Sequence, residues 1–479
     1  MDPHAKDSRR RLRGFLALTF LAGTLAAAAG APVRSSYGAR ITADEPEYLL
    51  TAMSLAEDRS LDVSDEIGDE RWRPFHEVRI RPQAKVLDGG RMVSPHDPLL
   101  PVLLVPGAAA GGWLGAKLTL SVVNGVLAAL ILWAAVRRYG CPPRRSALVV
   151  CLFAASAPLA VYGSQIYPEL PAALAVTVAI VCLSGPLTVR NLVVLSVAIV
   201  GLAWLSSKFI PVGAVLAAIA LWRLWRGGRL RTAVGLTAFF TLAGAAYLWG
   251  HLRWYGGLTV YATGWFFAET GELSVIGTDP DIPARSSRLI GLLVDRRFGL
   301  AAWQPAWLLL VPALAWISRK RIPNWEALVL PFATGWLGAT FLALTMHGWW
   351  FPGRQTVVVL PAAVLGIAAW TSSHRHVWPM AVIGAAGVFN LAWLFLQGWR
   401  RDLTMIVDFY ETSNPLYRTW ARLLPDYIAL DGGDWALHAA WAAAAVVSML
   451  VAAGAVGTGG RLRRVRRPRA ATGSAGRST

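Results

Sequence analysis

Long apolar runs, separated by short polar stretches, form the main pattern along the chain. Runs of about 18 or more apolar residues are typical of helices that cross a membrane. The segment Leu99–Ala109 is also apolar, but it is short and contains prolines, so we expect it to lie in the membrane interface. Twelve other runs are predicted to span the membrane, near residues 14–32, 114–135, 146–163, 169–186, 191–206, 209–225, 232–250, 299–317, 326–345, 356–371, 377–396 and 435–456.

The composition agrees with this pattern. Of the 479 residues, 55% are hydrophobic and only 15% are charged, and the mean hydropathy is +0.46. An ordinary soluble domain is about one quarter charged. The predicted fold class is therefore an all-α integral membrane protein with about 12 transmembrane helices and with interfacial helices in its external loops. The first run also has the pattern of a signal peptide that ends near Ala31. We expect an uncleaved span instead, because the topology requires an N-terminus in the cytoplasm.

The charged residues orient the predicted helices. The net charge is +18, yet Lys and Arg form short clusters between apolar runs, which is typical of topology signals and not of a nucleic-acid-binding face. No nucleic-acid partner is expected. With twelve spans, 25 of the 28 acidic residues fall on one side. The positive-inside rule makes the other side the cytoplasm and places both termini there. The basic clusters on that side are Arg9–Arg13, 137–145, 223–231, Arg319–Arg321, Arg375 and 461–469.

This topology predicts one polytopic domain over residues 1–458. Three external loops are long, namely 33–113, 251–298 and 397–434, and the first of them carries an acidic motif. The remaining residues, 459–479, are basic and rich in small residues, so we expect a disordered cytoplasmic tail near anionic lipid.

The acidic motif opens the first external loop, in the stretch "ITADEPEYLLTAMSLAED" that begins at Ile41. Asp44 and Glu45 are adjacent, and Pro46 suits the first turn of a helix. The apolar residues that follow have the spacing of an amphipathic interfacial helix. In the ordinary interpretation, Asp44 caps this helix. The alternative is a pair of catalytic carboxylates.

Other charged residues are predicted at external helix ends. Glu169 lies in "IYPELP", Lys208 in "WLSSKFIP", Arg354 in "HGWWFPGRQ" and Arg297 in "DRRFG". Each has an ordinary interpretation, such as a helix cap for Glu169, snorkelling for Lys208 and contact with lipid headgroups for Arg354. Together, carboxylates and cations at one face suit a lipid phosphate beside a hydroxyl nucleophile, because a carboxylate removes the proton and the cations stabilise the leaving phosphate.

These segments resemble a known superfamily, the polytopic GT-C glycosyltransferases that use polyprenyl-phosphate sugars. Protein O-mannosyltransferases, bacterial aminoarabinose transferases and actinobacterial arabinosyl- and mannosyltransferases belong to it. "ADEPEYLLTAMSLAEDRSLDV" and "GWWFPGRQTVVVLP" carry the resemblance. It implies an inverting transfer in which Asp44 is the general base. Glu45 is the other catalytic candidate and, with Glu169, would position the acceptor or a metal. Arg354, with Lys208 and Arg297, would bind the lipid phosphate.

The resemblance also bears on the acceptor and on metal. Where aminoarabinose transferases have a Lys-Pro-Pro element, this chain reads "SPHDPLLP", so that phosphate contact is not carried over. His96 and Asp97 in this stretch, with Glu169, are candidates to position the acceptor, although a hydrogen bond within the loop is the ordinary role of His96. Some relatives bind a divalent metal between the two acids, which here are Asp44 and Glu169. No other cofactor is expected.

The sequence therefore predicts a glycosyltransferase of a bacterial plasma membrane with its active site on the external face. The expected partners are a polyprenyl-phosphate sugar donor, a hydroxyl acceptor of the cell envelope and the lipid bilayer. Abundant Ala, Arg, Gly and Val with few Lys suit a high-GC bacterium such as an actinomycete. The alternative is a transporter or flippase for lipid-linked sugars. Such proteins usually place charges at mid-membrane and break paired helices, and neither pattern is evident here.

Overall fold

The computed structural model describes residues 3–265, 281–374 and 377–454. Within these ranges the fold is all-helical, and extended segments form only isolated β-bridges. The predicted tail, 459–479, lies outside the described residues, as does part of the predicted loop 251–298.

Among the described residues, seven helices are long and apolar enough to cross a membrane. This supports a multi-pass helical membrane protein. The spans are Arg9–Gly30 of α1 (Pro3–Gly30), α4 (Leu99–Arg137), Ser207–Arg226 with α9 (Ile210–Arg226), Leu230–Thr263 with α10 (Leu230–Tyr255), Val357–His374 with α17 (Leu360–His374), α18 (Val377–Arg400) and α20 (Gly432–Ala452).

The other five predicted spans are also helical, but they are shorter or broken. At a rise of about 1.5 Å per residue, a helix of 15 residues reaches only about 22 Å, less than the hydrocarbon core of a bilayer. The number twelve therefore stays a prediction. These helices are α5 (Pro143–Ala154) with α6 (Leu159–Tyr162), α7 (Glu169–Leu183), α8 (Val189–Leu205), α14 (Leu300–Trp303) with α15 (Leu310–Lys320), and α16 (Glu326–Leu337).

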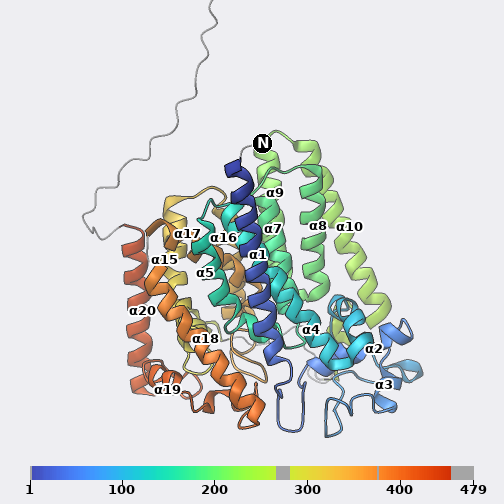
Figure 1. The fold of residues 1–479 in the computed structure, drawn as a ribbon. Coiled ribbons are helices and arrows are strands. Elements are labelled where there is room, and N and C mark those ends of the chain that lie inside the picture. The colour runs from blue at the N-terminus through green and yellow to red at the C-terminus, as the bar shows by residue number, and fades with distance from the viewer. Residues whose placement is uncertain (1–2, 266–280, 375–376, 455–479) are drawn as a thin grey trace, which may run out of the picture.

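Short helices fill the segments between the long ones. Residues 31–98 contain α2 (Glu45–Glu57) and α3 (Ser64–Gly68), which lie at the end of the bundle opposite the N-terminus (Figure 1). We call this end of the bundle the α2 end. The remaining short helices are α12 (Ile282–Arg285), α13 (Arg288–Val294) and α19 (Pro415–Ala421), with a π-helical turn at Gly338–Leu342 and 3-10 turns at Asp88–Gly90, Ser207–Phe209, Val260–Thr263, Pro305–Leu309, Val357–Val359 and Phe409–Glu411.

The expected interfacial piece Leu99–Ala109 is the first part of α4. The helix bends sharply at Gly111 and Gly112, and Gly112 has a φ of 54°. The two parts approach so closely that a Cβ atom on Gly107 would lie 2.6 Å from the carbonyl oxygen of Gly115. Only glycine tolerates both the positive φ and such an approach.

The helix predicted after Asp44 is α2, and protein covers most of it, while its position in the membrane interface stays a prediction. Nine of its thirteen residues are buried inside the protein, including Glu45, Glu47 and Tyr48. The helix packs against α4, and its side chains join the main hydrophobic core. A spacing of apolar residues shows that one face of a helix must be covered, but it does not show whether lipid or protein covers the other face.

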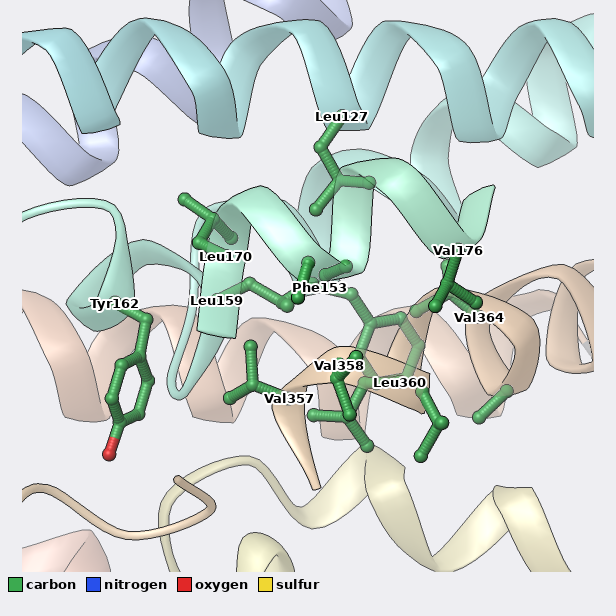
Figure 2. Close-up of a cluster of buried hydrophobic side chains, with 14 of the residues drawn as sticks. Leu127, Phe153, Leu159, Tyr162, Leu170, Val176, Val357, Val358, Leu360 and Val364 are labelled. Carbon is green, nitrogen blue, oxygen red and sulfur yellow. The ribbon is translucent and has the colours of Figure 1, made fainter. Parts of the chain in front are cut away.

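The centre of this core lies where α4 to α7 meet the Val357–Val359 turn and α17. Figure 2 shows Leu127, Phe153, Leu170 and Val357 pointing into one cluster, and all four are buried. Most of the α17 span is buried, whereas none of the most apolar 18-residue stretch of α20 is, as expected for a helix at the lipid-facing edge. The core fixes the position of α7, which begins at Glu169, relative to the Val357–Val359 turn, which begins three residues after Arg354.

Candidate active site

Asp44 immediately precedes α2, at the position of an N-cap. Its side chain makes no capping hydrogen bond to the helix. Instead, Oδ2 accepts a hydrogen bond from Nη2 of Arg354 at 2.6 Å, and Oδ1 accepts one from Nε2 of Gln83 at 3.0 Å. The capping interpretation therefore describes the place of Asp44 in the chain but not the contacts of its carboxylate.

Arg354 joins two carboxylates. Besides Asp44, its guanidinium bonds Glu169, with 3.0 Å between Nε and Oε1. Its Cζ atom lies 4.2 Å from the ring centroid of Tyr167, which orients the planar group. The preceding Gly353 has a φ of 88°, and a Cβ atom there would lie 2.8 Å from the side chain of Leu300. This tight turn aims Arg354 inward.

Lys208 completes the cluster. Its Nζ atom lies 2.5 Å from Oε1 of Glu169, the first residue of α7, whose side chain is fully buried. Two carboxylates and two cations thus meet, with a formal charge of zero. Burying one such charge alone would cost several kcal/mol, on the order of its lost hydration, so the groups depend on each other.

Three helices begin beside this cluster. Asp44 precedes α2, Glu169 opens α7, and Lys208 lies two residues before α9. The N-terminal end of a helix carries a partial positive charge and unpaired N–H groups, which favour anions. The cluster therefore lies where the backbone itself attracts negative charge.

The protonation of the groups outside the spans follows from their surroundings. Burial alone would raise the pKa of Asp44, but the charges of Arg354 and His96 and the hydrogen bonds from Gln83 and Arg354 outweigh it, so this pKa is held well below its ordinary value. Burial lowers the pKa of His96, and only part of that effect is offset by Asp44. Near neutral pH, Asp44 is ionised and His96 is uncharged.

Glu45, predicted to be catalytic, faces away from these charges. Its Oε2 atom accepts hydrogen bonds from the hydroxyl of Ser35 at 2.9 Å and from the backbone N–H of Thr42 at 3.0 Å. Its Oε1 atom accepts one from the N–H of Ile166 at 2.9 Å. Glu45 thus connects the start of α2 to the segment that leads into α7, which is a structural role.

His96 lies beside the cluster, and Asp97 lies behind it. The ring of His96 stacks on Tyr48, with 4.5 Å between centroids. The Oδ2 atom of Asp97 accepts a hydrogen bond from the backbone N–H of Ser207 at 3.2 Å. Its Oδ1 atom faces Nε2 of His251 at 3.1 Å and accepts a bond from the Tyr247 hydroxyl at 3.0 Å. Asp97 therefore holds the turn that carries Lys208.

The proposed phosphate ligand Arg297 is part of another charged cluster. Its Nη2 atom lies 2.9 Å from Oδ2 of Asp426, and its guanidinium stacks over Tyr410. Its neighbour Arg296 pairs with Asp434. Within the described residues, the side chain of Arg297 contacts Asp426 and Tyr410 and not Arg354, so the structure does not bring Arg297 into the Asp44 cluster.

The proposed metal position, between Asp44 and Glu169, is where Arg354 lies. A divalent ion that bound both acids there would have to displace this guanidinium, so the residues present do not fit a resident metal. Within the part of the chain that the structure describes, the carboxylates with metal-like spacing are the exposed Asp58 and Asp65 and the buried Glu66, all in the first loop. Exposed acidic groups of this kind are common without an ion.

Sequence reasoning missed Gln83, Tyr167 and His251. Gln83 lies 39 residues from Asp44, in an extended segment without a helical pattern that would place it. His251 had a usable signal, because a histidine inside a long apolar run is costly to bury without a partner. Its partner is Asp97.

No family model, no curated protein and no solved structure matches this chain. The GT-C resemblance therefore rests on the short segments around Asp44 and Arg354.

Proposed function

We propose that the protein is an inverting glycosyltransferase of the GT-C type. It would move a sugar from a polyprenyl-phosphate donor to a hydroxyl group of a cell-envelope glycan, lipid or protein. The observation that carries this proposal is the buried cluster in which Arg354 bonds both Asp44 and Glu169 while Lys208 bonds Glu169. It combines a proton acceptor with two phosphate-binding cations at the ends of apolar helices.

The proposed reaction is a single displacement at the anomeric carbon. The acceptor oxygen bonds to this carbon as the bond from carbon to the phosphate oxygen breaks. The bonding electrons stay on the phosphate, whose charge changes from −1 in the diester to −2 in the released monoester. Arg354 and Lys208 stabilise this added charge, with help from the nearby helix N-termini. The acceptor proton passes to the carboxylate of Asp44.

The ion pair between Asp44 and Arg354 gives the donor a second role. While Arg354 holds Asp44, this carboxylate is a weak base, because its pKa is held down. A phosphate that bonded Arg354 would weaken this pair and raise the pKa of Asp44 toward its ordinary range. Donor binding would therefore activate the base.

The proposed placement is a bacterial plasma membrane, with twelve spans, cytoplasmic termini and the α2 end on the external face. The asymmetry of charge supports it, because 25 of the 28 acids fall on the α2 side of that topology. Basic side chains mark the opposite end, where α9 ends in Arg223 and Arg226.

Transfer by purified protein tests the proposal. The protein in nanodiscs would be given polyprenyl-phosphate mannose or arabinose and an envelope-glycan extract, and labelled product would be measured. Asp44→Asn should lower the transfer rate by about 10²–10⁴-fold, the usual contribution of a general base. The matched control is Glu57→Gln, which alters an exposed acid of the same loop that pairs with Arg71.

Each contrary result has a clear meaning. Full activity of Asp44→Asn would remove Asp44 as the base. A wild-type protein that transfers no sugar, but moves the lipid-linked sugar across vesicle membranes, would establish the transporter alternative.

A further inference from the structure

Several buried polar atoms near Arg354 have no hydrogen-bond partner. They are the Tyr167 hydroxyl, Oε2 of Glu169, both amide atoms of Gln165, and Nε2 of His96. Among the described residues thirteen side-chain atoms are of this kind, and these five fall within residues 165–169 and at His96. The unpaired atoms are therefore concentrated in segments that form the site.

Such atoms are uncommon, because burying a polar group without a partner is unfavourable. Tyr167, Gln165 and Glu169 are each no more than 2% exposed. Their neighbourhood is well ordered by other contacts, since Ile166 donates to Glu45 and the ring of Tyr167 lies against Arg354. Atoms of this kind, on a segment that other contacts hold in place, can be paired by ordered water or by a bound polar ligand.

The kinds of atom indicate the ligand class. A phenol hydroxyl and an amide NH₂ group donate hydrogen bonds, while an amide oxygen and a carboxylate oxygen accept them. Groups that both donate and accept match this mixture, and hydroxyls do so. A second phosphate would be repelled by Glu169, and an apolar group would leave every atom unpaired.

We propose that Tyr167 and Gln165, with His96, form a hydroxyl-binding subsite for a sugar ring. This proposal rests on the proposed function, in which Arg354 binds the lipid phosphate. The ring of Tyr167 is 4.2 Å from the guanidinium carbon of Arg354, so a sugar attached to that phosphate would lie within reach of the Tyr167 hydroxyl. The acceptor sugar is the other possible source of the hydroxyls.

Tyr162 provides a matched control. Tyr162 and Tyr167 are both fully buried, and their ring centroids are 6.1 Å apart. The hydroxyl of Tyr162 donates to the backbone carbonyl of Phe351 at 2.5 Å, and Figure 2 shows this hydroxyl pointing away from the apolar cluster. The two tyrosines share type and burial but differ in whether the protein itself uses the hydroxyl.

The test compares Tyr167→Phe and Tyr162→Phe in nanodiscs. The measurements are melting temperature without ligand, and affinity for two probes, polyprenyl phosphate and polyprenyl-phosphate mannose or arabinose. Tyr167→Phe should keep or raise the melting temperature, leave bare-phosphate affinity unchanged, and weaken binding of the sugar-bearing lipid about tenfold. Tyr162→Phe should lower the melting temperature and leave the ratio of the two affinities unchanged. Gln165→Leu should behave as Tyr167→Phe does.

The remaining outcomes separate this subsite from the function on which it rests. If Tyr167→Phe spares donor binding but raises the acceptor KM, the subsite is supported and binds the acceptor sugar. If Tyr167→Phe lowers the melting temperature and changes neither donor affinity nor acceptor KM, the hydroxyl is structural and the subsite is refuted. If Arg354→Ala leaves binding of bare polyprenyl phosphate unchanged, the phosphate site itself fails, whatever Tyr167 does.

Discussion

Nη2 of Arg354 lies 2.6 Å from Oδ2 of Asp44, although 310 residues separate the two in sequence. Because the same guanidinium also bonds Glu169, it balances one fully buried carboxylate and that of Asp44, whose side chain is 22% exposed. The stability of the charge cluster therefore depends on the overall balance of positive and negative charge as well as on any single ion pair.

This balance predicts an asymmetry between single and double variants. Arg354→Met leaves the buried Glu169 and the partly buried Asp44 with Lys208 as the remaining cation of the cluster. The free energy of unfolding should therefore fall by about 3–5 kcal/mol. Adding Asp44→Asn leaves only Glu169 and Lys208 charged, so much of the lost stability should be regained. Donor binding should stay lost. Melting temperatures and donor-binding isotherms check both parts. A double variant as unstable as Arg354→Met would contradict charge balance.

Glu45 should contribute to the stability of the fold and not to catalysis. Glu45→Ala removes the acceptor of the Ser35 hydroxyl and of the backbone N–H groups of Thr42 and Ile166, so stability should drop by about 2–4 kcal/mol. Transfer per folded molecule should change little, and folded protein can be quantified by size-exclusion chromatography. A stable Glu45→Ala protein with a large loss of kcat would instead support the catalytic role that the sequence predicted.

The raised pKa of Glu47 predicts that the free energy of unfolding depends on pH. Burial raises the pKa of this carboxyl to about 7, and the hydrogen bond from the N–H of Gln83 offsets only part of that effect. Its ordinary value is 4.5, so the folded state binds this proton more tightly than the unfolded state does. The resulting stability is fully present below pH 4.5 and is lost as the pH rises through about 7.

Glu47→Gln removes this dependence. At pH 8 the variant should be more stable than the wild type by about 1–3 kcal/mol, with a smaller difference at pH 5. Melting curves between these pH values check the prediction. Glu66, whose pKa burial raises to about 8, acts in the same direction, so the difference between variant and wild type is the quantity to compare. Parallel curves for the two proteins would show that Glu47 does not titrate in this range.

The sequence indicates the position of the charged residues along the membrane normal better than their position within the plane of the membrane. Helix ends must lie near the membrane surfaces, so Asp44, Glu169, Lys208 and Arg354 could be assigned to one end of the bundle from spans alone, and the structure brings all four into contact. Arg297 was assigned to the same end by the same reasoning. It pairs with Asp426 instead, because which helices are neighbours depends on packing that charge does not encode.

The first loop shows a second limit. A helix after Asp44 follows from Pro46 and the apolar spacing, and α2 is there. Its burial, the contact from Gln83 and the unpaired hydroxyl of Tyr167 depend on how residues 31–98 fold over the helix ends. That path is set by contacts between distant segments, which a single sequence does not display.

Asp97 should affect the affinity for the donor indirectly, by positioning Lys208. Its carboxylate holds the N–H of Ser207, next to Lys208, while His251 and Tyr247 bond its other oxygen. Nδ1 of His251 faces the carbonyl of Tyr247 at 2.8 Å, and a carbonyl oxygen can only accept, so this nitrogen donates. Without Asp97, the turn at 207–209 loses this anchor and Lys208 loses its position against Glu169.

A double-mutant cycle tests this chain of contacts. Asp97→Ala and Lys208→Ala should each weaken binding of the donor about tenfold, and the double variant should be little weaker than either, a coupling on the order of 1 kcal/mol. The control is Tyr247→Phe, which removes one bond to Asp97 but spares the bond to Ser207, so donor affinity should change much less. Additive losses would mean that Asp97 acts on the donor independently of Lys208. That result would return Asp97 to the direct role in positioning the acceptor that its sequence context suggests.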